Sequence, residues 1–222
     1  MFGIKNFLFR GAGVVADMPD DVRQALLAWQ AMPEPVLNEA HFHVRYVVVD
    51  VTTSGSKPES DQLLSISALG LPRAGTIQPD DALFLDFSGM ENEVAAVDRQ
   101  LMAFLQFVAK APLVTFHSAF VLGFLRRAFK ERLGIDFEPQ CLDMAWLLPT
   151  LFEEKSAQPV SLDQWLACFE MSSEGRRAAM ANTLMLARLF QRLLARAVSK
   201  DIDTAARLFD EYSASTFLRR SH

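Results

Sequence analysis

Thiols are scarce in this sequence. Its 222 residues include only two cysteines, Cys141 and Cys168, and their spacing matches no metal-binding or redox motif. This scarcity excludes a disulfide framework and is typical of proteins from a reducing compartment. We expect both thiols to be buried as small apolar side chains.

Long hydrophobic runs are also missing. The longest stretch without a charged residue, residues 111–125, has 15 residues and contains Pro112, whereas a membrane-spanning helix needs about 20 apolar residues. Residues 1–10 mix apolar side chains with Lys5 and Arg10 and hold no continuous hydrophobic segment of the signal-peptide kind. We therefore expect a cytoplasmic protein without a membrane span.

Positive charge is in deficit, since 22 Lys and Arg stand against 27 Asp and Glu for a net charge of −5. Non-specific binding to nucleic acid depends on cations that neutralise phosphates. The composition therefore argues against a free-standing binder of this kind, and any binding of nucleic acid or nucleotides should be weak and salt-sensitive. With 50% apolar residues and 18 Phe, the chain is long enough for a bulky globular core.

The hydrophobic pattern predicts an α/β domain with one mixed sheet. The strongest strand signal is Tyr46–Val51, a β-branched run of the kind buried on both faces. Further strands are expected over residues 63–71, 82–87 and 113–116, and helices over residues 19–32, 91–110, 118–132, 143–148, 178–198 and 202–212, with one more opened by the capping box of residues 161–164. We expect Ser118 to cap its helix and Pro149 to end the helix that starts at Asp143.

Four short segments follow one another along the chain. Residues 49–55, Val-Asp-Val-Thr-Thr-Ser-Gly, come at the end of the buried strand, and residues 113–125 run from an apolar strand through His117 and Ser118 into a helix. Residues 142–143 are Leu-Asp, and residues 177–183, Arg-Ala-Ala-Met-Ala-Asn-Thr, open the long helix. Together they resemble the motifs of the DnaQ-like DEDD exonucleases, the family of the DNA polymerase III epsilon subunit.

The resemblance implies a ribonuclease H-like, exonuclease-type α/β fold: a mixed central sheet flanked by helices, over residues 41–199. Residues 1–40 would form an N-terminal helical extension and residues 200–222 a C-terminal helix. Family members hold two Mg²⁺ or Mn²⁺ ions with four carboxylates, and a histidine deprotonates the attacking water. Two metals need converging anions to hold them and to activate that water.

Read by position, the resemblance implies that most of this machinery is substituted. Only the first carboxylate remains, as Asp50. The other three acids correspond to Thr52, Val121 and Asn182, and the histidine corresponds to Arg177, which cannot be deprotonated. Residues 176–198 contain no Asp or Glu, so another register does not supply the missing acids. One carboxylate among neutral oxygens is a poor Mg²⁺ site, and we expect no metal cofactor.

Four further residues are candidates to line the same pocket, and each has a structural alternative. Ser54, like Thr52, suits a turn that bonds nearby backbone. His117 fits a hydrogen-bonded structural histidine better than a ligand. Ser118 is the expected helix cap, and Asp143 fits a helix N-terminal group.

Asp50 needs a partner, because a carboxylate at the end of an apolar strand is costly to bury alone. We predict that the guanidinium of Arg177 or Arg176 replaces the lost metals as its counter-charge. The alternative leaves both arginines in a solvated basic turn.

Three hypotheses of function remain. The first is an exonuclease-fold protein that has lost two-metal hydrolysis and acts in binding or regulation. The second is an active 3′–5′ exonuclease of single-stranded DNA or RNA, with Asp61, Glu59 or Asp143 as displaced ligands. The third is a scaffold that binds a protein partner, or itself, through residues 1–40 or the C-terminal helix.

Overall fold

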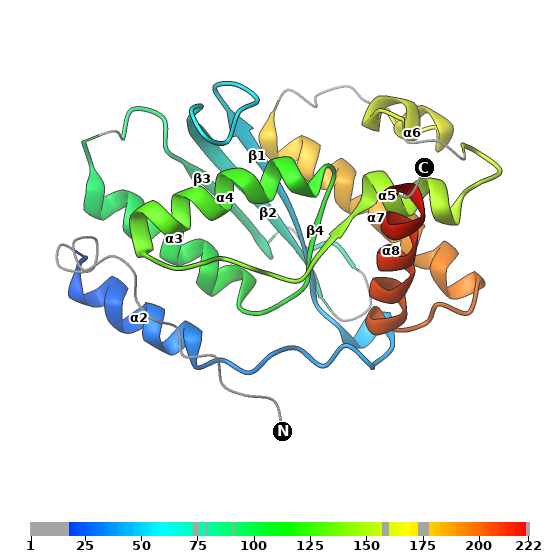
Figure 1. The fold of residues 1–222 in the computed structure, drawn as a ribbon, viewed down its shortest axis with the longest axis horizontal. Helices are drawn as coiled ribbons and strands as arrows, with labels where there is room; N and C mark the ends of the chain where they lie inside the picture. Colours follow the sequence, from blue (N-terminus) through cyan, green and yellow to red (C-terminus); the bar gives the residue numbers. More distant parts are fainter. Residues whose placement is uncertain are drawn as a thin grey trace.

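The computed structural model describes residues 18–72, 76–78, 80–90, 92–156, 160–172 and 178–220. Along the chain its elements are α2 (Asp20–Gln30), the 3-10 turn η1 (His41–His43), β1 (Tyr46–Thr53), β2 (Leu63–Leu71), β3 (Ala82–Asp86), α3 (Val94–Val108), β4 (Leu113–Thr115), α4 (Ser118–Leu133), β5 (Cys141–Asp143), α5 (Met144–Leu151), α6 (Leu162–Cys168), α7 (Ala179–Ser199) and α8 (Ala205–Arg220). Figure 1 shows these helices arranged around one central sheet.

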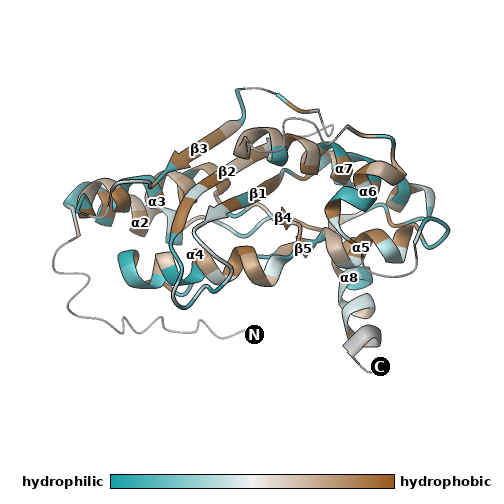
Figure 2. Ribbon diagram, turned by 90° about the horizontal axis from the view of Figure 1, so that it is seen from above, coloured by the Kyte–Doolittle hydropathy of each residue, from teal (hydrophilic) through white to brown (hydrophobic). Residues whose placement is uncertain are grey.

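The sheet has five strands in the order β3-β2-β1-β4-β5. β1 pairs with β2 and β2 with β3 in antiparallel fashion, whereas β1–β4 and β4–β5 are parallel. The sheet is therefore mixed, as the sequence predicts, and β1 lies at its centre. In Figure 2, β2 and β3 are predominantly hydrophobic.

Strand β1 is buried on both faces, as its β-branched run predicts, and its alternation divides the molecule into two cores. Tyr46 and Val48 belong to one core, which is formed with residues of α5, α6, α7 and α8. Val47 and Val49 belong to the other, formed with residues of α2, α3 and α4. Helices thus cover both faces of the sheet.

Three details differ from the expectation. The strand β5 is not anticipated, because its three residues are too short to show a period. Pro149 does not end α5, which continues to Leu151, since proline fits a helical φ and deletes only one intrahelical N–H. The last helix begins later and runs farther than residues 202–212, over Ala205–Arg220.

The cysteines agree only in part with the expectation of two buried thiols: the thiol of Cys141 is buried, and that of Cys168 is not. Cys168 is exposed and Cys141 is half-buried. Burial of the Cys141 thiol raises its pKa to about 12, so that it stays a protonated, unreactive thiol at neutral pH.

Within the described part of the chain, no helix combines the length and the apolar character that crossing a bilayer requires.

Candidate functional site

Asp50 lies near the end of β1, half-buried, on the face of the sheet that α7 covers. Its Oδ2 accepts a hydrogen bond from the Nδ2 of Asn182, in the first turn of α7, at 2.7 Å. The bond joins the two residues that the resemblance assigns to the first and the last carboxylate positions of the family. Because the partner is an amide, the contact neutralises none of the charge of Asp50.

A second polar pair fastens α7 to the sheet beside this contact. The hydroxyls of Ser67 on β2 and Thr183 on α7 lie 2.6 Å apart and are buried. Each hydroxyl also has a backbone carbonyl within reach: that of Ala179 lies 3.1 Å from Thr183 Oγ1, and that of Asp50 lies 3.4 Å from Ser67 Oγ. Successive residues of α7, Asn182 and Thr183, thus hold the start of the helix against β1 and β2.

Two of the other substituted positions, Thr52 and Val121, lie within the described residues. Thr52 is exposed near the end of β1. Val121, in the first turn of α4, is 1% exposed and belongs to the core on the opposite face of the sheet from α7. Val121 is therefore a packing residue, which agrees with its apolar side chain.

Asp143 is 2% exposed and acts as a cap for two helices at once. Its Oδ1 accepts the backbone N–H groups of His117 and Ala145, both at 2.9 Å, and its Oδ2 accepts that of Ser118 at 2.7 Å. The carboxylate therefore closes the N-termini of α4 and α5, where unpaired N–H groups and the helix dipoles favour an anion. This confirms the interpretation of Asp143 as a helix N-terminal group.

Neither His117 nor Ser118 takes its expected role. Ser118 is the first residue of α4, and the cap on its N–H is Asp143. His117 is exposed, with a left-handed backbone (φ 65°) and its ring edge-on to Phe116 at 4.6 Å between centroids. Within the described ranges its imidazole has no hydrogen-bond partner, so the expectation of a hydrogen-bonded structural histidine is wrong.

Ser54 is a turn residue. Its Oγ accepts the Gln62 N–H at 2.8 Å, and its own N–H donates to the Gln62 carbonyl at 3.0 Å. Inside this turn Asp61 accepts the N–H of Lys57 at 2.7 Å, and its carboxylate packs so closely that a Cβ on Gly55 would lie 2.3 Å from it. The carboxylate of Asp61 is therefore used to hold the turn.

Helix α4 anchors this turn from outside. The guanidinium of Arg127 donates to the backbone carbonyls of Pro58 and Asp61. Pro58 in turn packs so closely over Gly123 that a Cβ there would lie 2.8 Å from its ring. The turn is thus fixed by backbone and packing contacts, and Glu59 at its surface is exposed.

The predicted counter-charge of Asp50 falls on residues 173–177, which lie outside the described residues, so the Arg176 or Arg177 pairing stays a prediction. The bond that the structure does place on Asp50, from Asn182, is one that the sequence reasoning missed. Its signal was present in the sequence, because the resemblance assigns Asp50 and Asn182 to two carboxylate positions of one pocket.

The donors present do not fit a two-metal centre. Of the four carboxylate positions that the resemblance implies, one keeps its acid, and the Asn182 amide directs its N–H₂ group, not an oxygen, at that carboxylate. In the described ranges no three His, Cys, Asp or Glu side chains gather in a group that could hold a metal ion. Mg²⁺ and Mn²⁺ in such centres need several converging oxygen anions, and the described side chains do not supply them.

No family model matches the sequence, and no curated protein sequence matches it either. Similarity appears among solved structures of E. coli exonuclease I. The zinc-bound complex with single-stranded DNA has a TM-score of 0.55 at 16% identity over 75% of this chain and 42% of that one. The complex with a dT13 oligonucleotide has a TM-score of 0.54 at 14% identity over 75% and 43%.

This chain matches less than half the length of those exonuclease chains. At such low identity the similarity concerns the arrangement of the sheet and its helices and not the chemistry. The chain therefore has the ribonuclease H-like fold of the exonucleases: a five-stranded mixed sheet flanked by helices.

Proposed function

We propose that this chain is a DnaQ-like, epsilon-like exonuclease-fold protein that has lost two-metal hydrolysis and acts through binding or regulation. The observation that carries the proposal is the 2.7 Å bond from the Asn182 amide to the Asp50 carboxylate. In a two-metal nuclease that pair of positions supplies two anions that share cations. Here a neutral amide satisfies the remaining anion directly.

The positions of the other acids support the same conclusion. Asp143 and Asp61 are the expected stand-in ligands of an active enzyme, but backbone N–H groups occupy both oxygens of Asp143 and the Oδ2 of Asp61. Freeing Asp143 would uncap two helices, and freeing Asp61 would open the turn after β1. Glu59 is exposed on that turn, and a single mobile carboxylate does not hold Mg²⁺ in place.

The proposal includes weak binding of a single nucleic-acid strand. The similar exonuclease I structures contain single-stranded DNA or oligonucleotides, and the shared fold is the reason to test the same ligand here. The net charge of −5 limits the affinity, so we propose weak binding that falls steeply as salt is added. With so few thiols, we propose the cytoplasm as the location.

The experiment is a nuclease assay combined with a metal titration. The wild-type protein is incubated with 5′-labelled single-stranded DNA and RNA in Mg²⁺ or Mn²⁺, beside Asp50→Asn, with EDTA added in parallel reactions. We expect no release of nucleotides beyond that of Asp50→Asn, and no binding of two ions by calorimetry. Release that both EDTA and Asp50→Asn abolish, or tight binding of two ions that Asp50→Asn removes, would overturn the proposal.

A further inference from the structure

Helix α7 presents an outward face that is basic, in a chain that is acidic overall. The helix contains no Asp or Glu, and Arg188, Arg192 and Arg196 recur every four residues along it. Residues four apart lie on one face of a helix, so the three guanidinium groups form a single row. The net charge of the whole chain is −5, so this positively charged row has the opposite sign to the molecule as a whole.

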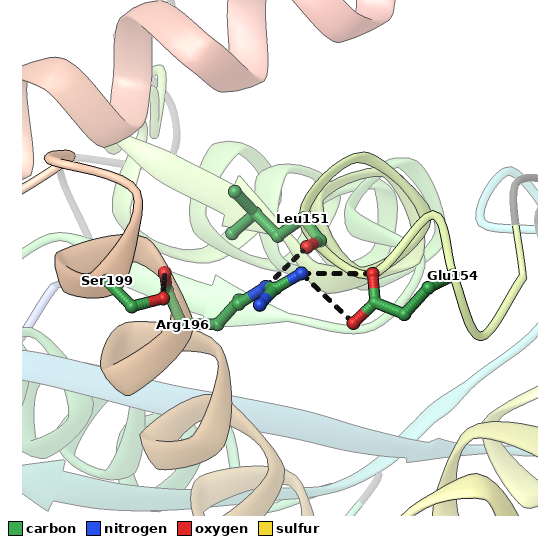
Figure 3. A network of polar contacts seen from close by, with 4 residues as sticks. All are labelled: Leu151, Glu154, Arg196 and Ser199. Carbon is green, nitrogen blue, oxygen red and sulfur yellow. Dashed lines mark hydrogen bonds and ion pairs between the residues drawn. The ribbon is translucent and has the colours of Figure 1, made fainter.

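Only one member of the row has an acidic partner among the described residues. Arg196 donates to both carboxylate oxygens of Glu154 at 3.0 Å and to the Leu151 carbonyl at 3.0 Å, as Figure 3 shows. Arg188 and Arg192 are exposed and make no salt bridge within the described ranges. Arg192 instead lies over the ring of Phe169, 5.6 Å from its centroid.

These two arginines border a surface groove of about 780 Å³. One wall is the outward stripe of α7, and the other is the segment that follows α6. Met171, Leu184 and Met185 line the groove and are only partly buried against the core beneath. Among the described residues that line it, Glu170 is the one acid.

We propose that this groove is a docking site for an acidic, amphipathic helical segment of a partner protein. The argument is charge complementarity combined with the apolar lining. A helix carrying acids four residues apart repeats its carboxylates about every 6 Å, the same spacing as Arg188 and Arg192. Its apolar residues would then face the two methionines, whose flexible side chains adapt to different partners.

A single strand of nucleic acid fits the groove less well. Strand binding without sequence preference relies on aromatic rings on which bases stack, and none of the described residues that line the groove is aromatic. The groove also lies on the outward side of α7, whereas Asn182 and Thr183 face the sheet and Asp50. The docking site is therefore independent of the function proposed for the Asp50 region.

The test is a selection from a random display library of peptides about 16 residues long, enough for about four helical turns. The full-length wild-type protein is the target, and the enriched peptides are then measured by fluorescence anisotropy. The charge-reversal variant is Arg188→Glu with Arg192→Glu. The matched control, Arg126→Glu with Lys200→Glu, changes exposed cations outside the groove and gives the same net charge.

We expect peptides enriched in Asp and Glu with apolar residues at helical spacing, and at least about tenfold weaker binding to the groove variant. Binding to the control variant should stay within about twofold of wild type, and circular dichroism should show both variants folded. Enrichment without acidic residues, no enrichment, or equal losses in both variants would overturn the proposal. So would oligo(dT) that binds the groove more tightly than the peptides and is lost in the groove variant.

Discussion

At the scale of single residues, the contact between Asp50 and Asn182 is the one most open to chemical test. The Asn182 amide donates to the carboxylate at 2.7 Å. Replacing the amide by a second carboxylate recreates the pair of acids found in the nuclease family without the other ligands. The two oxygen anions would then face each other with no proton between them at neutral pH.

We therefore predict that Asn182→Asp lowers the free energy of unfolding by about 2 kcal/mol near neutral pH, because a hydrogen bond to a charged group becomes a like-charge contact. The loss should shrink near pH 5, where the two acids can share a proton. Urea denaturation at both pH values measures it, with Asn182→Ala as the control that adds no charge. A stable variant whose stability does not respond to pH would contradict this.

His41 is a second residue whose environment makes a pH-dependent prediction. It is 5% exposed, with Nε2 2.9 Å from the Ile202 carbonyl and Nδ1 2.8 Å from the Tyr46 hydroxyl. Nε2 therefore carries the proton and the Tyr46 hydroxyl donates to Nδ1. Burial lowers the pKa of His41 below its ordinary value, against the opposing effects of the Ile202 carbonyl and Asp203.

The folded state thus favours neutral His41, and the unfolded chain takes up a proton first as the pH falls below about 6.5. Its contribution to stability is complete above that pH and is lost as the pH drops towards the lower, folded-state pKa. We predict a smaller loss of stability between about pH 7.5 and 5.5 in His41→Gln than in wild type. Urea denaturation measures this, and His43→Gln, an exposed neighbour, should keep the wild-type slope.

At the scale of elements, Asp143 couples α4, β5 and α5. It is the last residue of β5, and its two oxygens accept three backbone N–H groups from the starts of both helices. The two helices pack on opposite faces of the sheet. The buried Asp143 side chain therefore fixes the start of one helix on each face of the sheet, at the C-terminal ends of the parallel strands β4 and β5.

We predict that Asp143→Ala lowers the free energy of unfolding by about 3 kcal/mol, because it leaves three N–H groups unpaired at two helix ends. Asp136→Ala is the control: it removes an exposed carboxylate that pairs with Lys130 at 2.6 Å, and surface pairs contribute under about 1 kcal/mol. Urea denaturation of both variants provides the comparison. Equal effects would show that the capping bonds are not what makes Asp143 matter.

The sequence predicts the elements well wherever many residues repeat one pattern. The run of valines in β1 identifies a strand buried on both faces, and the capping box that begins at Ser161 is present, with both of its reciprocal bonds. The sequence does not show which distant segments come into contact. Asp143 is correctly predicted as a helix cap, but that it also caps α4 depends on β4 and β5 lying side by side.

For the candidate site, too, the sequence shows local features but not the contacts between distant segments. The substituted residues at positions 52, 121 and 182 can be read from the motifs, because each motif is a short continuous segment. Which of them meet in space depends on the packing of α7 against β1 and β2. Of these residues, Asn182 bonds to Asp50, whereas Val121 belongs to the opposite core, and no local pattern distinguishes these two outcomes.

At the scale of the whole molecule, segments from both ends of the chain are packed into the fold. Met18, Val22 and Leu26 belong to the core that α3 and α4 form on the sheet. The Trp29 Nε1 donates to the Ala109 carbonyl at 2.6 Å. The segment before η1 then meets the start of α8, where Ala206 donates its N–H to the Leu37 carbonyl at 2.9 Å and Ala40 bridges Thr204.

Removing residues 1–40 should therefore damage the fold as well as any partner site in them. We predict that this truncation lowers the free energy of unfolding by about 5 kcal/mol, since it exposes the surface that three buried apolar side chains cover. Removing residues 1–17 alone leaves all of these contacts in place and serves as the control. Urea denaturation that finds the long truncation as stable as the full chain would contradict the prediction.

A point substitution separates packing from loss of the segment as a whole. Leu26 is 4% exposed, whereas the next residue along α2, Leu27, is 55% exposed. Both lie in the same helix and lose the same atoms on truncation to alanine, so helix propensity cancels between them. We predict that Leu26→Ala lowers the free energy of unfolding by about 3 kcal/mol through a cavity between α2 and α3, and that Leu27→Ala changes it by under about 0.5 kcal/mol. Equal effects in urea denaturation would mean that α2 does not depend on the core for its place, and residues 1–40 would then be free to act as a separate docking segment.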